Sequence, residues 1–512
     1  MATSQQIMGT WILIIFYSLL IIYFVVRGAI KTKSLSDYAV GNINFTPGFV
    51  GLSLAVSMTS AATFIVNPGL IAVYGFSGVL SFGIFFPLAT IISLIVLTKS
   101  FRKYGQTLKA VTLAQWIGKR YESKYYALFM GFLSFLLITF IVLILVALTK
   151  VLSKALNANE IIVLAVIIVF VFGYMMFGGA NSLVYTNTIQ AFVMLAVAFI
   201  LLFSGYEYFQ DGIEGFFEKL AAIDPVLTKP TNPQSVLFRD FFEIIVAQII
   251  VGAAVVCQPH IITKSLFLKE EKDVNRFLTA AVIAEIIFFS VVFVGLYARL
   301  TFPEMTDGQE ILKTDGIISA YVVKIFSNGI LSVIVGLIVI LGLISAGLST
   351  LEGLIQSLST TITSDIIKPI FGKYIKTDKT YIALNKLAII FLAIVSFLVS
   401  LEQLLYPKLS VAILAQNGVY AYFSVAFIPI VFGIFIKDVN IKAPVIASIV
   451  AFITHFTVYY GLPFLVNNYG ADFGYFTKYL EGPVRNPAIA SASAIIISTL
   501  AGIIVHQFTK KK

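Results

Sequence analysis

Two polar stretches interrupt apolar segments of the chain, and their oxygen atoms are of the kind that bind an alkali cation. The stretch 345–360 (SAGLSTLEGLIQSLST) carries the adjacent hydroxyls of Ser349 and Thr350, and the stretch 48–69 (GFVGLSLAVSMTSAATFIVNPG) carries serine, threonine, asparagine and proline between glycines. A helix of the second composition can unwind where it is buried against protein or water, and unwound backbone exposes carbonyl oxygens to a cation. Two hydroxyls facing such carbonyls would bind Na⁺ without a formal charge. The alternative is that these hydroxyls bond back to their own helices or join two helices.

A third stretch, 252–264 (GAAVVCQPHIITK), is also interrupted by glycine and proline. Interrupted apolar segments at corresponding positions in two halves of a chain are typical of inverted-repeat transporters. If residues 46–206 and 240–436 form two five-helix units, each unit opens with an interrupted helix. The pattern therefore predicts a transporter built from two related units.

Two glutamates lie within apolar segments. Glu352 follows Ser349 by three residues, so the two side chains share one side of a helix. A carboxylate in a membrane span is costly, and it marks a functional hypothesis. Glu285 lies in another apolar segment with no partner identifiable from the sequence, and for it we prefer a packing or cavity-lining role.

The elements that must position these residues are membrane-spanning helices. Of the 512 residues, 59% are hydrophobic and only 12% are charged, with a mean hydropathy of +0.97. Soluble domains are about one quarter charged, so the chain is predicted to be an integral membrane protein. Helices are expected because a lipid-exposed backbone must satisfy its own hydrogen bonds, and β-barrel strands would alternate in hydropathy. We predict thirteen spans, at approximately 7–27, 46–73, 78–99, 125–156, 160–178, 181–206, 240–263, 274–300, 328–366, 383–405, 409–436, 442–465 and 486–508.

The basic residues predict the orientation of these spans. The net charge is +10, and we interpret the excess as a topology signal rather than as a nucleic-acid interface, because cytoplasmic loops are enriched in Lys and Arg. The bias places the N-terminus outside and the C-terminus in the cytoplasm. Most of the Lys and Arg residues then fall in the cytoplasmic segments 27–33, 99–124, 264–276, 368–386, 437–442 and 510–512.

Several functional classes are disfavoured by what the sequence contains. It has no G-x-x-x-x-G-K-[ST] motif, which argues against a nucleotide-driven pump. Cys257 is the single cysteine, and His260, His455 and His506 lie far apart, so neither a metal cluster nor an enzyme active site is expected. An ion channel with polar pore-lining residues and a transporter-like nutrient sensor remain as alternatives.

Five motifs, taken in order along the chain, resemble the sodium/solute symporter family. They are the small and polar residues before NPG at 55–69, TLAQW…GKRY at 112–121, FGGANSLVYTNTIQA at 177–191, CQPH at 257–260 and AGLSTLE at 346–352.

The resemblance implies a fold and a cation site. The fold would be all-α and of the LeuT type, with thirteen transmembrane helices. Its inverted repeats would be 46–206 and 240–436, with one extra helix at 7–27 and two extra helices within 442–508. Na⁺ would be the coupling ion, with no organic cofactor and no nucleotide. By position, its ligands would be the carbonyls of Val56, Thr59 and Ala346 and the hydroxyls of Ser349 and Thr350.

Two residues depart from the family pattern. Many relatives carry Asp where this chain has Asn187, and Glu352 falls on a position where relatives with a second sodium site have a hydroxyl. We therefore hypothesise that Asn187 and Glu352 form a second cation site or a proton site. The alternative is a protonated Glu352 hydrogen-bonded in the core, since burial disfavours the charged form. Met58 replaces an Asp of the proline transporters, which weakens a proline assignment.

The resemblance also indicates a solute pocket between the two interrupted helices and the span 125–156. No Lys or Arg is evident in this pocket, so a carboxylate would meet the amides at an unwound helix end. We expect Na⁺-coupled symport of a small monocarboxylate across the plasma or inner membrane. A proline-like amino acid or pantothenate, coupled to Na⁺ or H⁺, is the alternative, and the oligomeric state is left open. By position, the predicted lining residues are Ser60, Thr63, Ile141, Val251, Val255, Gln416, Asn417 and Tyr420.

Overall fold

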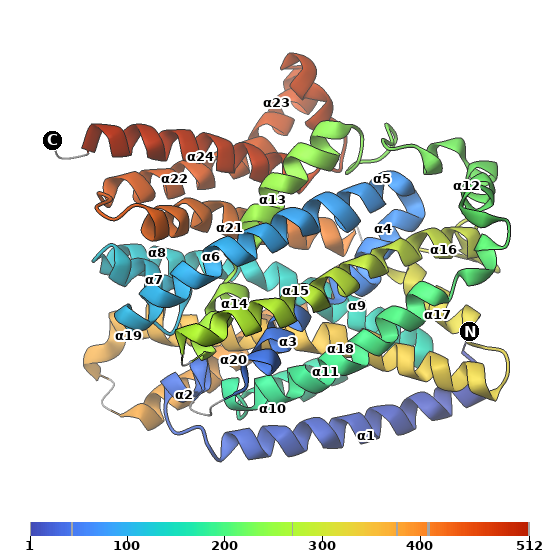
Figure 1. Ribbon diagram of the computed structural model, residues 1–512, viewed down its shortest axis with the longest axis horizontal. Coiled ribbons are helices and arrows are strands. Elements are labelled where there is room, and N and C mark those ends of the chain that lie inside the picture. The colour runs from blue at the N-terminus through green and yellow to red at the C-terminus, as the bar shows by residue number, and fades with distance from the viewer. Residues whose placement is uncertain (1, 42–44, 269, 375–376, 407–409, 510–512) are drawn as a thin grey trace.

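The protein is a bundle of long helices that run roughly side by side along its longest axis (Figure 1). The computed structural model describes residues 2–41, 45–268, 270–374, 377–406 and 410–509, so the basic tail 510–512 lies outside the described residues. Ten helices in this part of the chain are long and apolar enough to cross a membrane, and twelve spans result if each of two bent helix pairs counts as one. The remaining predicted span, 160–178, is the fifth in chain order, and it corresponds to a shorter apolar helix of 16 residues. The chain is therefore a predominantly helical, multi-pass membrane protein.

The helices of the first half of the chain begin and end close to the predicted spans. They are α1 (Ser4–Ala29), α2 (Leu35–Val40), α3 (Pro47–Met58), α4 (Asn67–Tyr74), α5 (Phe76–Gly78), α6 (Phe86–Leu108), α7 (Leu113–Arg120), α8 (Lys124–Leu133), α9 (Ile138–Leu156), α10 (Glu160–Met175) and α11 (Ala180–Phe203). π-helical turns at Ala62–Val66 and Val79–Phe85 lead into α4 and α6.

The second half continues the same architecture. Its helices are α12 (Gly212–Ile223), α13 (Gln248–Val255), α14 (Pro259–Ile262), α15 (Val274–Ser290), α16 (Val294–Thr301), α17 (Ile317–Ile325), α18 (Ile330–Thr361), α19 (Lys368–Phe371), α20 (Asp378–Leu405), α21 (Val411–Phe435), α22 (Lys442–Phe456), α23 (Leu462–Tyr469) and α24 (Pro487–Thr509). A π-helical turn at Phe242–Ala247 opens α13, and a short hairpin pairs β1 (Thr306–Asp307) with β2 (Glu310–Ile311).

Two helices are broken, each within a stretch that the sequence singles out. The first bends by 52° between Pro47–Met58 and Ala62–Tyr74, and the second bends by 56° between Phe242–Val255 and Pro259–Phe267. At the first break Thr59 leaves helical geometry, and its hydroxyl bonds to the Ala55 carbonyl at 2.6 Å. At the second break the extended residue is Gln258, because a residue that precedes proline is disfavoured in the α conformation.

Small residues bring the broken helices close to their neighbours. At Gly51 of α3 an added Cβ would lie 2.4 Å from the Phe277 carbonyl of α15. Gly295 of α16 approaches the Pro68 carbonyl of α4 so closely that a Cβ would lie 2.2 Å away, and at Gly69 a Cβ would lie 2.3 Å from the Thr314 carbonyl. The first broken helix is therefore packed backbone against backbone along both of its halves.

The core lies where the broken helices meet α9, α18 and α21. α18 and α21 are almost entirely buried over their middle turns, whereas α1 keeps an exposed apolar face, as expected for a helix that borders lipid. α22 and α24 pack against α21 and against each other on one side of the bundle (Figure 1). The central helices can therefore present polar groups to an enclosed space.

Candidate sodium site and solute cavity

The hydroxyls of Ser349 and Thr350 meet the last turn of α3 in the buried core. The Ser349 hydroxyl donates to the carbonyl oxygens of Val56 at 2.8 Å and Ala346 at 3.1 Å. The Thr350 hydroxyl donates to the carbonyls of Val56 and Ser57, each at 3.2 Å. Both side chains are fully buried. Two hydroxyls on α18 and several backbone oxygens therefore converge at the end of α3, which is an uncharged oxygen set suited to an alkali cation.

Four of the five predicted sodium ligands thus come together, and Ser57 adds a carbonyl that the sequence did not single out. The fifth, Thr59, is the buried residue at which α3 ends. Its amide and its hydroxyl both bond to the Ala55 carbonyl, and no hydrogen bond joins it to Ser349 or Thr350.

Glu352 and Asn187 have different hydrogen-bond partners. Glu352 is buried one turn from Ser349, and it accepts hydrogen bonds from the Tyr174 hydroxyl and, at 2.9 Å, from the Thr186 hydroxyl. Asn187 instead donates to the hydroxyls of two α3 serines. No hydrogen bond joins the two side chains, so the pairing expected from the sequence is not direct. The reason is helical geometry, since Thr186 and Asn187 are adjacent on α11 and point in different directions.

The position of Lys264 differs from the sequence interpretation. The sequence places it among the basic residues of a cytoplasmic segment, but the structure buries its side chain in the core, with 2% of the residue exposed. Its ammonium donates to the Ser53 carbonyl and hydroxyl, each at 2.7 Å, and to the Ser57 hydroxyl at 2.6 Å. The available signal was its place one turn after the second break, where the helix has not yet left the core.

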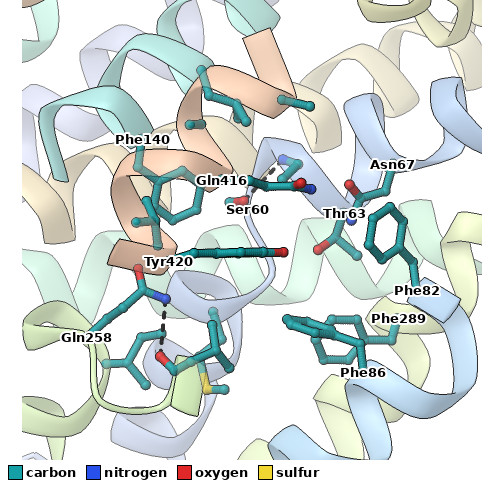
Figure 2. A pocket seen from close by; sticks show the side chains of 18 residues that line it. Ser60, Thr63, Asn67, Phe82, Phe86, Phe140, Gln258, Phe289, Gln416 and Tyr420 are labelled. Atoms are coloured by element: carbon teal, nitrogen blue, oxygen red, sulfur yellow. Dashed lines mark hydrogen bonds between the residues drawn. The ribbon is translucent and has the colours of Figure 1, made fainter. Parts of the chain in front are cut away.

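A cavity of about 680 Å³, including the part open to solvent, lies between the two breaks. Figure 2 shows Gln416 and Tyr420 extending from α21 towards Ser60, Thr63 and Asn67 of the first broken helix. Among the described residues no charged side chain lines this space. Its walls are largely aromatic and aliphatic, with Phe82, Phe86, Phe140 and Phe289 contributing rings.

Five of the eight predicted lining residues face this cavity: Ser60, Thr63, Val255, Gln416 and Tyr420. The other three, Ile141, Val251 and Asn417, do not. Ile141 and Val251 are fully buried between helices. Asn417 turns away from its neighbour Gln416, donates to the Tyr460 hydroxyl at 2.8 Å and bonds to Nε2 of His455 at 3.0 Å. Consecutive residues of a helix face directions about 100° apart. Gln416 therefore faces the cavity, while the next residue, Asn417, faces His455 and Tyr460.

Gln258 is a cavity residue that the sequence analysis missed. Its amide nitrogen donates to the Val255 carbonyl at 3.1 Å, while its amide oxygen is buried without a hydrogen-bond partner. Figure 2 shows the side chain at the Tyr420 end of the cavity. Because the amide nitrogen is engaged by a carbonyl, the free atom must be the acceptor. A buried acceptor of this kind suits a ligand that brings a hydrogen-bond donor.

Comparison with known proteins agrees with the fold. The family model described as the sodium:solute symporter family matches residues 38–451. A sodium/pantothenate symporter of Haemophilus influenzae is 28% identical over 291 residues, which is 56% of this chain and 58% of that protein. A monocarboxylic acid transporter of Corynebacterium glutamicum is 20% identical over 94% of this chain and 89% of its own length.

A solved structure shares the fold over nearly the whole length. It is a Na⁺-coupled sialic acid symporter in a substrate-bound outward-open state, with a TM-score of 0.74, 18% identity, and coverage of 97% of this chain and 98% of that one. The fold is that of a LeuT-type carrier, in which broken helices surround a central site. The chain belongs to the sodium:solute symporter family, and it is a membrane transporter rather than an enzyme.

Proposed function

We propose that the protein couples the entry of Na⁺ to the uptake of a small organic monocarboxylate by alternating access. The observation that carries the proposal is the convergence of the Ser349 and Thr350 hydroxyls on the Val56 carbonyl, beside a broken helix and next to an uncharged cavity. The membership of the sodium:solute symporter family supports Na⁺ as the coupling ion. No organic cofactor is needed for such a cycle.

The sodium ion would bind the oxygens of Val56, Thr59, Ala346, Ser349 and Thr350. Such an ion joins α3 to α18, and it favours the conformation in which these helices are in contact, because a ligand shifts an equilibrium by its differential affinity for the two states. The driving free energy is the Na⁺ concentration gradient together with about 2.3 kcal/mol per charge per 100 mV of membrane potential. Solute then binds a cavity that the ion has ordered.

The solute would lie with its carboxylate at the start of the second half of the first broken helix. The helix Ala62–Tyr74 begins there, and Ser60 and Thr63 supply hydroxyls. The positive end of a helix dipole attracts anions. The phenylalanine rings that line the same cavity would hold an apolar body. The cavity has no fixed cation among its described lining residues, which fits one carboxylate better than a dianion.

The free acceptor of Gln258 favours a monocarboxylate that also carries a hydroxyl or an N–H group. Lactate and pantothenate have such donors, whereas acetate and propionate do not. Pantothenate is therefore the second candidate, and the similarity to a sodium/pantothenate symporter supports it alongside the similarity to a monocarboxylic acid transporter. A proline-like amino acid, coupled to Na⁺ or H⁺, is the less favoured candidate because Met58 lines the cavity where a carboxylate would be needed.

The moving units would be the two inverted repeats. We assign 46–206 to the first and 240–436 to the second, with 7–27 and 442–508 as additional helices and α10 as the span that completes thirteen. From the positions of the basic residues we assign the N-terminus to the outside and the C-terminus to the cytoplasm. Rocking of one repeat against the other would expose the cavity to each side of the membrane in turn.

Transport in proteoliposomes tests the function. We expect saturable uptake of radiolabelled lactate or pantothenate that requires an inward Na⁺ gradient and is not supported by K⁺. The variant Ser349→Ala should lose most of this stimulation, whereas Ser357→Ala on the same helix should not. Na⁺ current without saturable solute uptake would instead indicate a channel, and solute binding without uptake would indicate a sensor.

A further inference from the structure

The Lys264 ammonium has three N–H donors, and three oxygen acceptors surround it. Three acceptors from α3, the Ser53 carbonyl and the hydroxyls of Ser53 and Ser57, lie 2.6 to 2.7 Å from the nitrogen. A lysine ammonium has three N–H donors and no acceptor. The surroundings are therefore built for the charged form of this side chain, although the residue is buried.

The two serine hydroxyls have no capacity left for another cation. Each accepts one hydrogen bond from Lys264 and a second from the amide nitrogen of Asn187, at 3.1 Å for Ser53 and 3.2 Å for Ser57. The Ser57 hydroxyl also donates to the Ser349 carbonyl at 3.5 Å. A hydroxyl oxygen has two acceptor lone pairs. At each serine one lone pair accepts from Lys264 and the other accepts from Asn187. A free ion can reach these oxygens only if the ammonium leaves.

Ser57 connects this cluster to the sodium site. Its hydroxyl holds the Lys264 ammonium, while its carbonyl accepts the hydrogen bond from Thr350. The buried carboxyl group of Glu352, two residues beyond Thr350, interacts electrostatically with Lys264, and no direct ion pair joins these two described residues. Burying a charge is costly unless it is hydrogen-bonded and compensated, and here both conditions are met by residues that border the sodium site.

We propose that the Lys264 ammonium is a tethered cation that permanently occupies a second monovalent-cation position between α3 and α11, so that the carrier moves a single Na⁺ with each solute. The proposal rests on the sodium site assigned above to Ser349 and Thr350. Shortening the lysine side chain vacates the position between Ser53, Ser57 and Asn187. A small free cation, either Na⁺ or an alkylammonium ion, then binds there and restores the connection between the two helices.

The experiment measures the ratio of ²²Na⁺ to solute flux in proteoliposomes, and the dependence of uptake on Na⁺ concentration, for the wild type, Lys264→Ala and the control Lys272→Ala. Lys272 is an exposed lysine in the same segment of the chain. In the wild type and the control we expect one Na⁺ per solute and a Hill coefficient near one. In Lys264→Ala, uptake should fall about tenfold or more, because an uncompensated buried carboxyl and two unpaired serines remain.

Rescue separates a cation position from a purely structural anchor. Methylammonium or ethylammonium should restore uptake in Lys264→Ala and raise its unfolding temperature, with no such effect on the wild type. At high Na⁺ the variant should show a Hill coefficient approaching two. Uptake by Lys264→Ala that is unchanged, or that no cation restores, would overturn the proposal.

The wild-type flux ratio tests the proposal even if Lys264→Ala does not fold. A ratio of two Na⁺ per solute would contradict the proposal that Lys264 occupies the second cation position. Failure of the sodium site itself has a different signature. In that case Ser349→Ala would keep the Na⁺ dependence of the wild type, while stabilisation of Lys264→Ala by alkylammonium ions could still be observed.

Discussion

The two broken helices share a geometry but use it differently. They bend by similar angles, 52° and 56°, and they border the same cavity. The break after α3 lies among small and hydroxyl-bearing residues, so backbone carbonyls are accessible to the hydroxyls of α18. The break after α13 is set by Pro259, and its polar contributions are side chains: the Gln258 amide at the cavity and the Lys264 ammonium beneath it.

The difference shows that a break defines where polar groups can gather but not which groups they are. At the first break backbone carbonyl oxygens form the proposed ion site, so the residues of α3 there need only be small enough to leave those oxygens accessible. At the second break side chains supply the polar atoms, so their identity decides what is bound. Substitutions at the first break should therefore act mainly on ion binding. Those at the second break should act on solute selection through Gln258 and on the number of bound ions through Lys264.

The largest effect is expected at the first break. Thr350→Ala removes a hydroxyl that meets the carbonyls of Val56 and Ser57. Loss of such a buried oxygen ligand costs about 1.5–3 kcal/mol, so the Na⁺ concentration for half-maximal uptake should rise about tenfold or more. Na⁺ titration of uptake measures this. If Thr350→Ala and the control Ser357→Ala behave alike, the carbonyls of α3 do not form the ion site.

The next effect concerns Glu352, which is buried on α18 two residues after Thr350. Glu352→Gln removes an ionisable carboxyl group that interacts electrostatically with Lys264. We expect the apparent affinity for Na⁺ to fall about threefold to tenfold, since unit charges in a partly polar interior interact by a few kcal/mol that local relaxation reduces. Titrations of Na⁺ at several pH values measure the change. A variant that transports with the same Na⁺ and pH dependence would make Glu352 only a hydrogen-bonded core residue.

At the second break the effect should depend on the solute. Gln258→Ala removes the free acceptor from the cavity. We expect the affinity for lactate or pantothenate to fall about fivefold, which corresponds to about 1 kcal/mol for a neutral hydrogen bond, while acetate is unaffected. Competition against a labelled solute measures the difference. Asn417→Ala is the matched control, because Asn417 faces His455 and Tyr460 instead of the cavity. If Asn417→Ala lowered the affinity for solute as much as Gln258→Ala does, Gln258 would have no specific role in solute recognition.

The smallest effect concerns the anchor of the second broken helix. Burial alone would raise the pKa of Asp240, but hydrogen bonds from Lys478, the Glu243 amide and Tyr479 outweigh it and leave the pKa below its usual value. Since the unfolded-state pKa is about 3.9, this stabilisation is fully present above that pH and is lost as the pH falls through the folded-state value.

The corresponding variant is Asp240→Asn, which should lower the unfolding temperature by about 2 °C near neutral pH, because the group is largely solvent-screened. The difference from the wild type should shrink below about pH 4. Thermal unfolding across pH measures both. The first broken helix, by contrast, begins at Thr46 and Pro47 without a side-chain cap. If the difference in unfolding temperature between Asp240→Asn and the wild type did not change with pH, the charge of Asp240 would not stabilise the start of the second broken helix.

The sequence predicted what local composition determines. The span positions, both breaks and the hydroxyl pair of Ser349 and Thr350 follow from apolar runs, glycine and proline, and adjacent polar residues. The position of Lys264 could not be predicted, because a lysine near a span end looks like a loop residue until the packing of α14 against α3 and α18 is known. The choice between Gln416 and Asn417 as a cavity residue depends on the rotation of α21 by one residue.

The ring-lined wall escaped prediction for a related reason. Phe82, Phe86 and Phe289 lie in apolar runs where phenylalanine is ordinary, so nothing local distinguishes a ring that faces lipid from one that faces a cavity. Only the tertiary arrangement of α6 and α15 around the first broken helix makes that distinction.

The close approach of Gly295 to Pro68, and of Gly69 to Thr314, has a mechanical consequence. Backbones in direct contact, with no side chain between them, cannot slide along each other without a steric clash. We therefore expect α4, α16 and the turn that precedes α17 to move as one rigid unit. Any motion of the half Ala62–Tyr74 must therefore move α16 and the turn before α17 with it as one rigid body. The flexible joint is then confined to the three residues between Met58 and Ala62.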